Sequence, residues 1–199
     1  MRTIILLVMV VVVGGLAAVA VWKETEATHY YSGYRWQYTS VSWCFSTSLP
    51  TNWQSQYNSA AATWNASPSR WTLGRVSSCL NALAFAGRRS FSQQGWPRWP
   101  GITFVGITGN YVTSASTDLN TDLNWSTNLP EGGSMGSPGN MCSPSCDIKT
   151  MIMHEMGHWV YFLDGGCDTS PKSIMCVDYR VRRSISSHDS SSLVTIYGS

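Results

Sequence analysis

Charged side chains are scarce in this sequence. They make up 12% of the 199 residues, and the formal net charge is +2, whereas soluble proteins usually contain about 25% charged residues. No basic stripe is present, so we expect no nucleic-acid partner. We interpret the short run Arg180, Arg182 and Arg183 as a solvated face. Internal repeats are also absent, and the length suits one substantial domain rather than two.

The N-terminus has the pattern of a targeting segment. Arg2 precedes an apolar run over residues 4–22, and residues 18–20 provide the small side chains that a signal peptidase prefers. We interpret residues 1–20 as a signal peptide. The alternative is an uncleaved anchor that extends to about residue 22, because the run is long enough to cross a bilayer. In both cases the rest of the chain lies outside the cytoplasm, and it contacts a membrane only if this segment is retained.

The remaining chain divides into a short polar lead-in, residues 21–33, and one domain, residues 34–199, which we expect to be a monomer. The six cysteines agree with export, because an even number in an oxidising compartment predicts three disulfides. An alternative structural zinc site made from the last four cysteines does not match the spacing of paired zinc knuckles. Proximity in the sequence favours the pairs Cys44–Cys79, Cys142–Cys146 and Cys167–Cys176.

Hydrophobic periodicity predicts strands and one helix in the first two thirds of the domain. The helix is expected to begin at Asn52, because apolar side chains then recur at helical spacing up to Ala66. Strands are expected over residues 41–45, 71–76 and 101–108, with one or two more over 111–127. A Gly-, Ser- and Pro-rich loop over residues 129–146 follows, and it is stapled if its two cysteines pair.

A second helix is predicted to begin after Asp147, an N-cap residue, and to carry His154, Glu155 and His158. The two histidines then lie about 40° apart around the helix axis and one turn apart along it, so both rings can bind one ion. Neutral imidazole nitrogens suit Zn²⁺, and a catalytic zinc ion keeps three protein ligands and one open position. Glu155 lies about 60° from His158, close enough to take a proton from a water molecule on the ion without being a ligand.

The third zinc ligand is less obvious, because the chain has only 4 histidines. Asp164 follows the second histidine closely and precedes two glycines. In a continuous helix Asp164 would point about 240° away from His158. The helix must therefore end near residues 159–161 and the chain must turn back. Asp168 and His188 are the alternative ligands.

The stretch HEMGHWVYFLD, residues 154–164, resembles the metzincin motif HExxHxxGxxH/D in its minority form with aspartate as the third ligand. Ser173-Ile174-Met175 resembles the Met-turn of that clan, and residues 185–198 resemble the last helix of the matrixins, the branch that includes the matrix metalloproteinases. Residues 34–50 and the helix after them resemble the first strand and first helix of a matrixin. The resemblance covers most of residues 34–199.

This resemblance implies an α+β, metzincin-like fold: a twisted mixed β-sheet, an active-site helix, a Met-turn, a C-terminal helix, and a cleft beneath an edge strand. It implies a secreted zinc endopeptidase that acts on proteins or peptides, with one catalytic zinc ion bound by His154, His158 and Asp164. Glu155 would be the general base, and Met175 would form a hydrophobic floor below the metal. The residues implied to line the substrate pocket are Val177, Asp178 and Tyr179.

Two features depart from the family pattern. Tyr161 stands at the position of the motif's glycine, where a positive φ costs a tyrosine about 1 kcal/mol or more. No cysteine precedes Cys44, so no cysteine-switch propeptide is visible. The resemblance allows calcium, but no calcium site can be identified. Two alternatives remain: a zincin of another clan with a different third ligand, and an inactive extracellular binding module that contains zinc.

Overall fold

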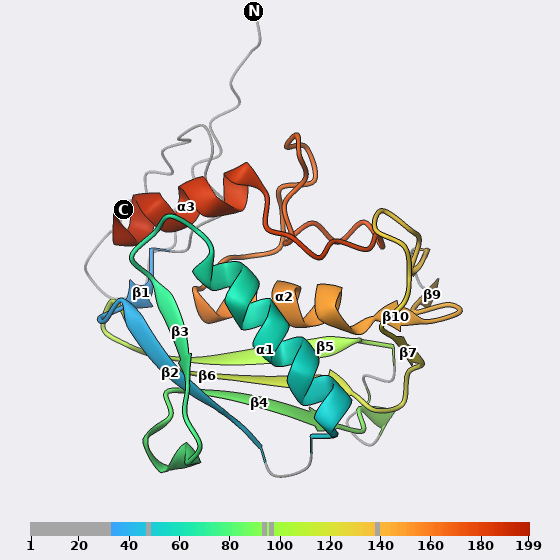
Figure 1. Ribbon diagram of the computed structural model, residues 1–199, viewed down its shortest axis with the longest axis horizontal. Helices are drawn as coiled ribbons and strands as arrows, with labels where there is room; N and C mark the ends of the chain where they lie inside the picture. The colour runs from blue at the N-terminus through green and yellow to red at the C-terminus, as the bar shows by residue number, and fades with distance from the viewer. Residues whose placement is uncertain (1–32, 47–48, 93–94, 96–97, 138–139) are drawn as a thin grey trace, which may run out of the picture.

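The computed structural model describes residues 33–46, 49–92, 95, 98–137 and 140–199. The predicted signal peptide or anchor and most of the lead-in lie outside these residues. Figure 1 shows a mixed β-sheet with helices stacked on one side of it. The helices are α1 (Thr51–Asn65), α2 (Ile148–Trp159) and α3 (Ser187–Tyr197), and a short 3₁₀ helix, η1, spans Cys79–Asn81.

The main sheet contains six strands. Five follow the order β1-β6-β4-β2-β3, and β5 pairs with β6 outside this path. All of these pairs are parallel except β5 with β6, which is antiparallel. Among the described strands β5 pairs only with β6, so it forms an edge of the sheet. The strands are β1 (Arg35–Trp36), β2 (Ser40–Phe45), β3 (Thr72–Arg75), β4 (Ala84–Arg89), β5 (Gly101–Thr108) and β6 (Tyr111–Asn120).

Two small two-stranded sheets lie in the segment that leads to α2. β7 (Trp125–Ser126) pairs in parallel with β10 (Cys146–Asp147), and β8 (Gly136–Ser137) pairs antiparallel with β9 (Asn140–Met141). The disulfide Cys142–Cys146 closes the loop between β9 and β10. The predicted Gly-, Ser- and Pro-rich loop is therefore stapled, and it contains short strands that the sequence pattern does not reveal.

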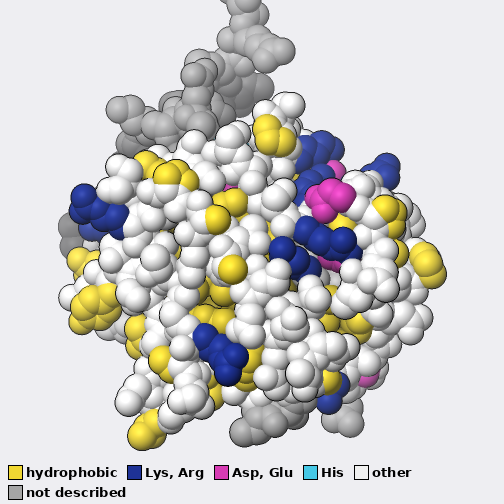
Figure 2. Space-filling view, in the orientation of Figure 1, with side chains coloured by type: hydrophobic (Ala, Val, Ile, Leu, Met, Phe, Trp, Pro, Cys, Tyr) yellow, Lys and Arg dark blue, Asp and Glu magenta, His cyan; other side chains and the backbone are white. Residues whose placement is uncertain are grey.

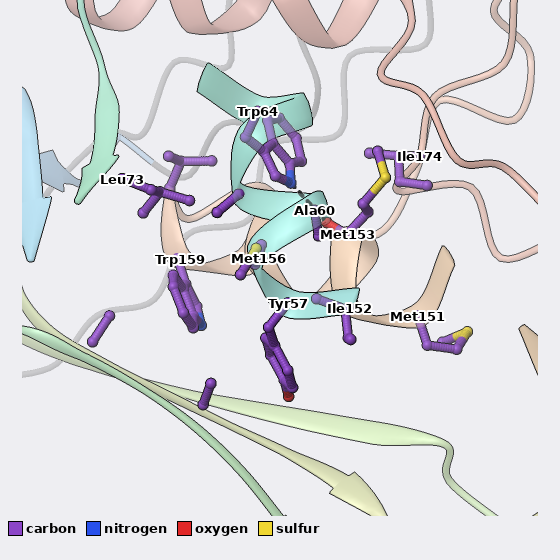
Figure 3. Packing of buried hydrophobic residues seen from close by; sticks show 14 of the residues in the cluster. Tyr57, Ala60, Trp64, Leu73, Met151, Ile152, Met153, Met156, Trp159 and Ile174 are labelled. Atoms are coloured by element: carbon purple, nitrogen blue, oxygen red, sulfur yellow. Dashed lines mark hydrogen bonds between the residues drawn. The ribbon is translucent and has the colours of Figure 1, made fainter. Parts of the chain in front are cut away.

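The core lies between the sheet and the two longer helices (Figure 3). α1 contacts α2, and α2 contacts β5 and β6, so α2 is covered on two sides. Trp64 of α1 and Trp159 of α2 are fully buried, and the indole of Trp64 donates a 3.1 Å hydrogen bond to the Met153 carbonyl oxygen. This burial explains why α2 is apolar around most of its circumference, with even Glu155 only 4% exposed.

The α+β expectation is confirmed, and several element boundaries agree with the predicted ones. The strand predicted over 101–108 is β5, the helix predicted from Asn52 is α1, and α2 ends at Trp159 inside the required range. The polar stretch 111–127 forms two strands, β6 and β7. Phe162 and Leu163 lie beyond the end of α2, where Phe162 is buried and Leu163 is exposed.

All three predicted disulfides are present: Cys44–Cys79, Cys142–Cys146 and Cys167–Cys176. Three disulfides in one domain are typical of an oxidising, extracellular-type environment. No helix within the described ranges has the length and apolar character required to span a membrane.

The arginine run before α3 differs from its expected role as a solvated face. Figure 2 shows basic and acidic side chains side by side on the part of the surface where the loops between α2 and α3 run. The guanidinium of Arg182 pairs with Asp178, and that of Arg183 pairs with the fully buried Asp147. Only Arg180 of this run is exposed. The prediction is therefore wrong for Arg182 and Arg183. Asp178 lies only four residues from Arg182, whereas Asp147 lies 36 residues from Arg183 and escapes a local reading.

Candidate metal centre

The helix that carries the candidate ligands, α2, begins at a buried cap. The side chain of Asp147 accepts hydrogen bonds from the Thr150 backbone N–H at 2.9 Å and from its hydroxyl at 2.8 Å. This satisfies a backbone donor that the first turn of a helix leaves without a partner. Arg183 neutralises the buried carboxylate. The start of α2, and with it the direction of the side chains one to two turns later, is therefore fixed by an ion pair with a distant loop.

Two imidazoles and one carboxylate converge at the other end of α2. Asp164 Oδ1 lies 3.1 Å from His154 Nε2 and 3.5 Å from His158 Nε2. All three candidate ligand atoms lie within 4.8 Å of one another, and among the described residues this is the only such group of His, Cys, Asp or Glu. Ligands of a tetrahedral zinc ion with bonds of 2.0–2.1 Å are separated by about 3.3 Å. The donor types and their spacing thus fit a zinc ion.

The second ring nitrogen of each histidine is held by a backbone carbonyl. His154 Nδ1 lies 3.1 Å from the Ile174 oxygen, and His158 Nδ1 lies 2.6 Å from the Phe162 oxygen. A carbonyl can only accept, so each Nδ1 carries a proton. In the neutral ring Nε2 then has a lone pair for a metal ion, and in the protonated ring it donates to Asp164. Metal-binding histidines are commonly oriented by a hydrogen bond of this kind.

A tight reversal after α2 brings Asp164 back to the histidines. The Tyr161 N–H bonds to the His158 carbonyl and the Phe162 N–H bonds to the Gly157 carbonyl, at 2.9 Å and 3.1 Å. Tyr161 adopts φ 63°, the left-handed conformation expected for the glycine that it replaces. The Gly165 N–H then bonds to the Met175 carbonyl at 3.0 Å. The carboxylate is thus placed by backbone hydrogen bonds on both sides.

Met175 packs against α2 at Gly157, one residue before His158. Its side chain is fully buried, and an added Cβ at Gly157 would clash with its sulfur. The backbone around it is tied to α3, because the buried Asp189 carboxylate accepts hydrogen bonds from the Ser173 hydroxyl at 2.7 Å and from the Ile174 N–H at 3.2 Å. The same Ile174 residue orients His154. A segment far along the chain therefore supports one of the two imidazoles.

Glu155 lies next to the ligand group but belongs to none of its contacts. Its carboxylate Oε2 accepts a 2.6 Å hydrogen bond from the Thr103 hydroxyl on β5. A cavity of about 540 Å³ opens beside Glu155, the two histidines and Asp164. The apolar side chains that line the cavity are Ile102, Val105, Met135, Met141, Met151 and Ile174. An acidic group, a metal-binding group and an apolar recess thus share one opening below an edge strand.

Of the three residues that the family resemblance implied for the substrate pocket, two line the cavity. Val177 and Tyr179 line the cavity. Asp178 does not line it, because its carboxylate turns to the other side of the loop and pairs with Arg182 and with Lys172, the latter at 3.1 Å. Hydrogen bonds from these two cations outweigh the effect of burial and lower the pKa of Asp178. Asp178 is therefore part of an ion-pair cluster, of which only Arg182 lines the cavity.

Even without an ion, the candidate ligands shift one another's pKa values. Burial alone would lower the pKa of His158, but its hydrogen bond to Asp164 and the charge of Glu155 outweigh burial and raise the pKa. Burial would raise the pKa of Asp164, but hydrogen bonds from His154 and His158 hold it well below its ordinary value. The site thus favours a bound positive charge between the rings and the carboxylate, whether that charge is a proton or a metal ion.

The two alternative third ligands lie elsewhere. Asp168 is exposed in the loop after Asp164, and His188 lies in the first turn of α3, where its carbonyl accepts a hydrogen bond from Ser192. Neither belongs to the ligand group. Sequence reasoning missed Thr103 and Gly101, which contact Glu155 from β5. No local signal could have revealed them, because their position depends on how β5 packs against α2.

Comparison with known proteins adds no assignment. No protein-family model matches the chain, and no curated protein matches it.

Proposed function

We propose that this protein is a secreted zinc endopeptidase, a matrixin-like member of the metzincin clan, that hydrolyses peptide bonds in proteins or peptides. The observation that carries the proposal is the convergence of two imidazole Nε2 atoms and one carboxylate oxygen, with a buried glutamate one residue after the first imidazole. The ligand set of three leaves a fourth tetrahedral position open, as catalytic zinc sites do and structural sites do not.

In this proposal His154, His158 and Asp164 hold the ion, which when bound polarises the scissile carbonyl and lowers the pKa of a water molecule. Glu155 accepts the proton from the attacking water and delivers it to the departing nitrogen. A purely structural zinc site has no use for such a carboxylate, and burying one is costly unless it is hydrogen-bonded. Its burial beside the ligands supports a catalytic site over the inactive binding module.

The surroundings of the site suit an extended polypeptide. The edge strand β5 leaves one side without a strand partner among the described residues, and Ile102 and Thr103 of β5 line the cavity. An extended segment can add to such an edge by backbone hydrogen bonds while a side chain enters a neighbouring pocket. We propose that the substrate lies along β5 with one apolar side chain in the cavity.

The family assignment rests on the stretch HEMGHWVYFLD together with what surrounds it. The chain reverses after His158 through a residue with positive φ, and the buried Met175 packs against α2 at Gly157. A zincin of another clan would draw its third ligand from elsewhere, and no other candidate among the described residues joins the group. These observations favour the metzincin interpretation over the other clans.

The direct test compares the wild-type domain with Glu155→Gln. Both are expected to contain zinc, because Glu155 is not a ligand, but Glu155→Gln should hydrolyse casein or a quenched peptide about 10²–10⁴-fold more slowly, the usual contribution of a general base. A chelator should abolish wild-type activity, and added zinc should restore it. If the folded, zinc-loaded wild type cleaves nothing, or if Glu155→Gln remains fully active, the proposal is wrong.

A further inference from the structure

Two threonine hydroxyl groups, one fully buried and one half-buried, connect Glu155 to Trp159 of the same helix by hydrogen bonds. Trp159 Nε1 donates a 2.8 Å hydrogen bond to Thr117 Oγ1. Thr117 Oγ1 lies 2.6 Å from Thr103 Oγ1, which in turn lies 2.6 Å from Glu155 Oε2. Trp159 and Glu155 are four residues apart on α2. The hydrogen bonds therefore run from Trp159 through one threonine on each of two strands and return to the same face of the helix one turn earlier.

The two end groups of this hydrogen-bonded series determine which group donates each hydrogen bond. An indole N–H can only donate and an ionised carboxylate can only accept, whereas each hydroxyl donates one proton. Thr117 therefore accepts from Trp159 and donates to Thr103, and Thr103 donates to Glu155. Thr103 Oγ1 also lies 3.3 Å from the Glu155 carbonyl oxygen, but its single proton goes to the shorter contact with the carboxylate.

The β-sheet holds this arrangement rigidly. Thr103 and Thr117 are directly opposite each other in the antiparallel β5–β6 ladder, and both Thr117 and Trp159 are fully buried. Gly101 lies two residues before Thr103, on the same side of β5. A Cβ at Gly101 would lie 2.6 Å from Glu155 Oε1 and 2.8 Å from Cδ. Strand β5 thus binds one carboxylate oxygen and makes room for the other.

We propose that Thr103 is a positioning residue for Glu155, and that it holds Oε2 so that Oε1 is the oxygen that exchanges the proton with water. This inference rests on the proposed endopeptidase function. Thr103 takes no part in proton transfer itself, because its only proton is committed to Oε2. Its contribution is to restrict the carboxylate to one orientation, and errors of about 1 Å in such a group can reduce a rate by about 10²-fold.

The test uses three substitutions on β5. Thr103→Val removes the hydroxyl but keeps the shape of the side chain, Thr103→Ser keeps the hydroxyl, and Thr108→Val makes the same change at an exposed position of the same strand. Thr103→Val should reduce kcat by roughly 10- to 100-fold, with KM within about twofold and with unchanged zinc content, because neither substrate nor metal contacts are lost. Thr103→Ser should keep most of the wild-type kcat, and Thr108→Val should match the wild type.

A crystal structure of metal-free Thr103→Val provides a second measurement that does not depend on turnover. The Glu155 carboxylate is expected to rotate away from the position that it has beside Thr103. An unchanged carboxylate, an unchanged kcat, or an equal loss in Thr103→Ser would overturn the proposal. If the wild type itself shows no hydrolysis, the proposed function fails, but the position of the carboxylate still decides whether Thr103 orients it.

Gly101→Ala keeps the proposal testable if Thr103→Val does not fold. The added methyl group would press on the Glu155 carboxylate from the same strand without touching the three metal ligands. We expect zinc to be retained and kcat to fall while KM changes little. Full activity in a folded Gly101→Ala variant would show that the orientation of Glu155 is not set by β5, which contradicts the proposal.

Discussion

At the scale of single residues, Tyr161 is the most unusual position in the site. A tyrosine with φ 63° stands where the chain must reverse between His158 and Asp164. Its ring packs edge-on against Tyr34, with ring centroids 5.3 Å apart. The aromatic contact offsets part of the cost of a left-handed backbone, which is about 1–2 kcal/mol for a residue with a Cβ. The backbone conformation matched what the sequence motif required even though its usual glycine is missing.

Two substitutions at this position separate the ring contact from the backbone strain. Tyr161→Ala and Tyr161→Gly both lose the ring, but only glycine adopts positive φ without strain. We expect Tyr161→Gly to be more stable than Tyr161→Ala by about 0.5–1 kcal/mol, after allowing for the extra freedom of glycine in the unfolded chain. Urea denaturation of the two variants measures this difference. Equal stabilities, or a more stable alanine variant, would mean that the left-handed conformation is not maintained in solution.

At the scale of elements, the start of α2, the helix that carries the two candidate histidine ligands, is tied to the loop before α3. Asp147 is fully buried, caps α2 and pairs with Arg183. Arg182 donates its backbone N–H to the Thr150 hydroxyl at 3.0 Å, in the first turn of the same helix. The arginine run that appeared to be a solvated face therefore anchors the helix that carries the ligands. Its sequence showed the charges but not their partners.

Two substitutions of Asp147 separate the contribution of its ion pair to stability from that of its helix cap. Asp147→Asn keeps a capping side chain but loses the ion pair, and we expect it to lower the free energy of unfolding by roughly 1–2 kcal/mol. Asp147→Ala loses both interactions and should cost roughly 2–4 kcal/mol. The exposed Asp168→Ala is the matched control and should change stability by less than about 0.5 kcal/mol. Thermal or chemical denaturation checks the order, and an alanine variant as stable as the wild type would contradict it.

At the scale of the whole molecule, local patterns predicted elements better than they predicted contacts. The apolar, β-branched run 101–108 identified β5, and the requirement that Asp164 return to His158 correctly located the end of α2. The disulfide pairs followed from proximity in sequence and are confirmed. Except for Cys44–Cys79, whose cysteines are 35 residues apart, the determining information lies within a short segment of the chain.

Contacts between distant segments were not predictable in this way. Thr103 reaches Glu155 only because of the β5–β6 register and the packing of α2 on both strands. Asp178 was assigned to the pocket from its place in the motif, but its carboxylate pairs with cations on the other side of the loop. The Thr103 contact depends on segments far apart in sequence, which no spacing rule contains. The partners of Asp178 lie only four and six residues away, but spacing alone does not tell whether its side chain turns to them or into the cavity.

The central claim is that Asp164 completes a three-ligand zinc site with His154 and His158. The most direct test is the zinc content of the purified wild-type domain, of Asp164→Ala and of Asp168→Ala after dialysis at neutral pH. We predict about one zinc ion per chain in the wild type and in Asp168→Ala, and loss of most of the zinc from folded Asp164→Ala. Stoichiometric zinc in Asp164→Ala, or none in the folded wild type, would contradict the account.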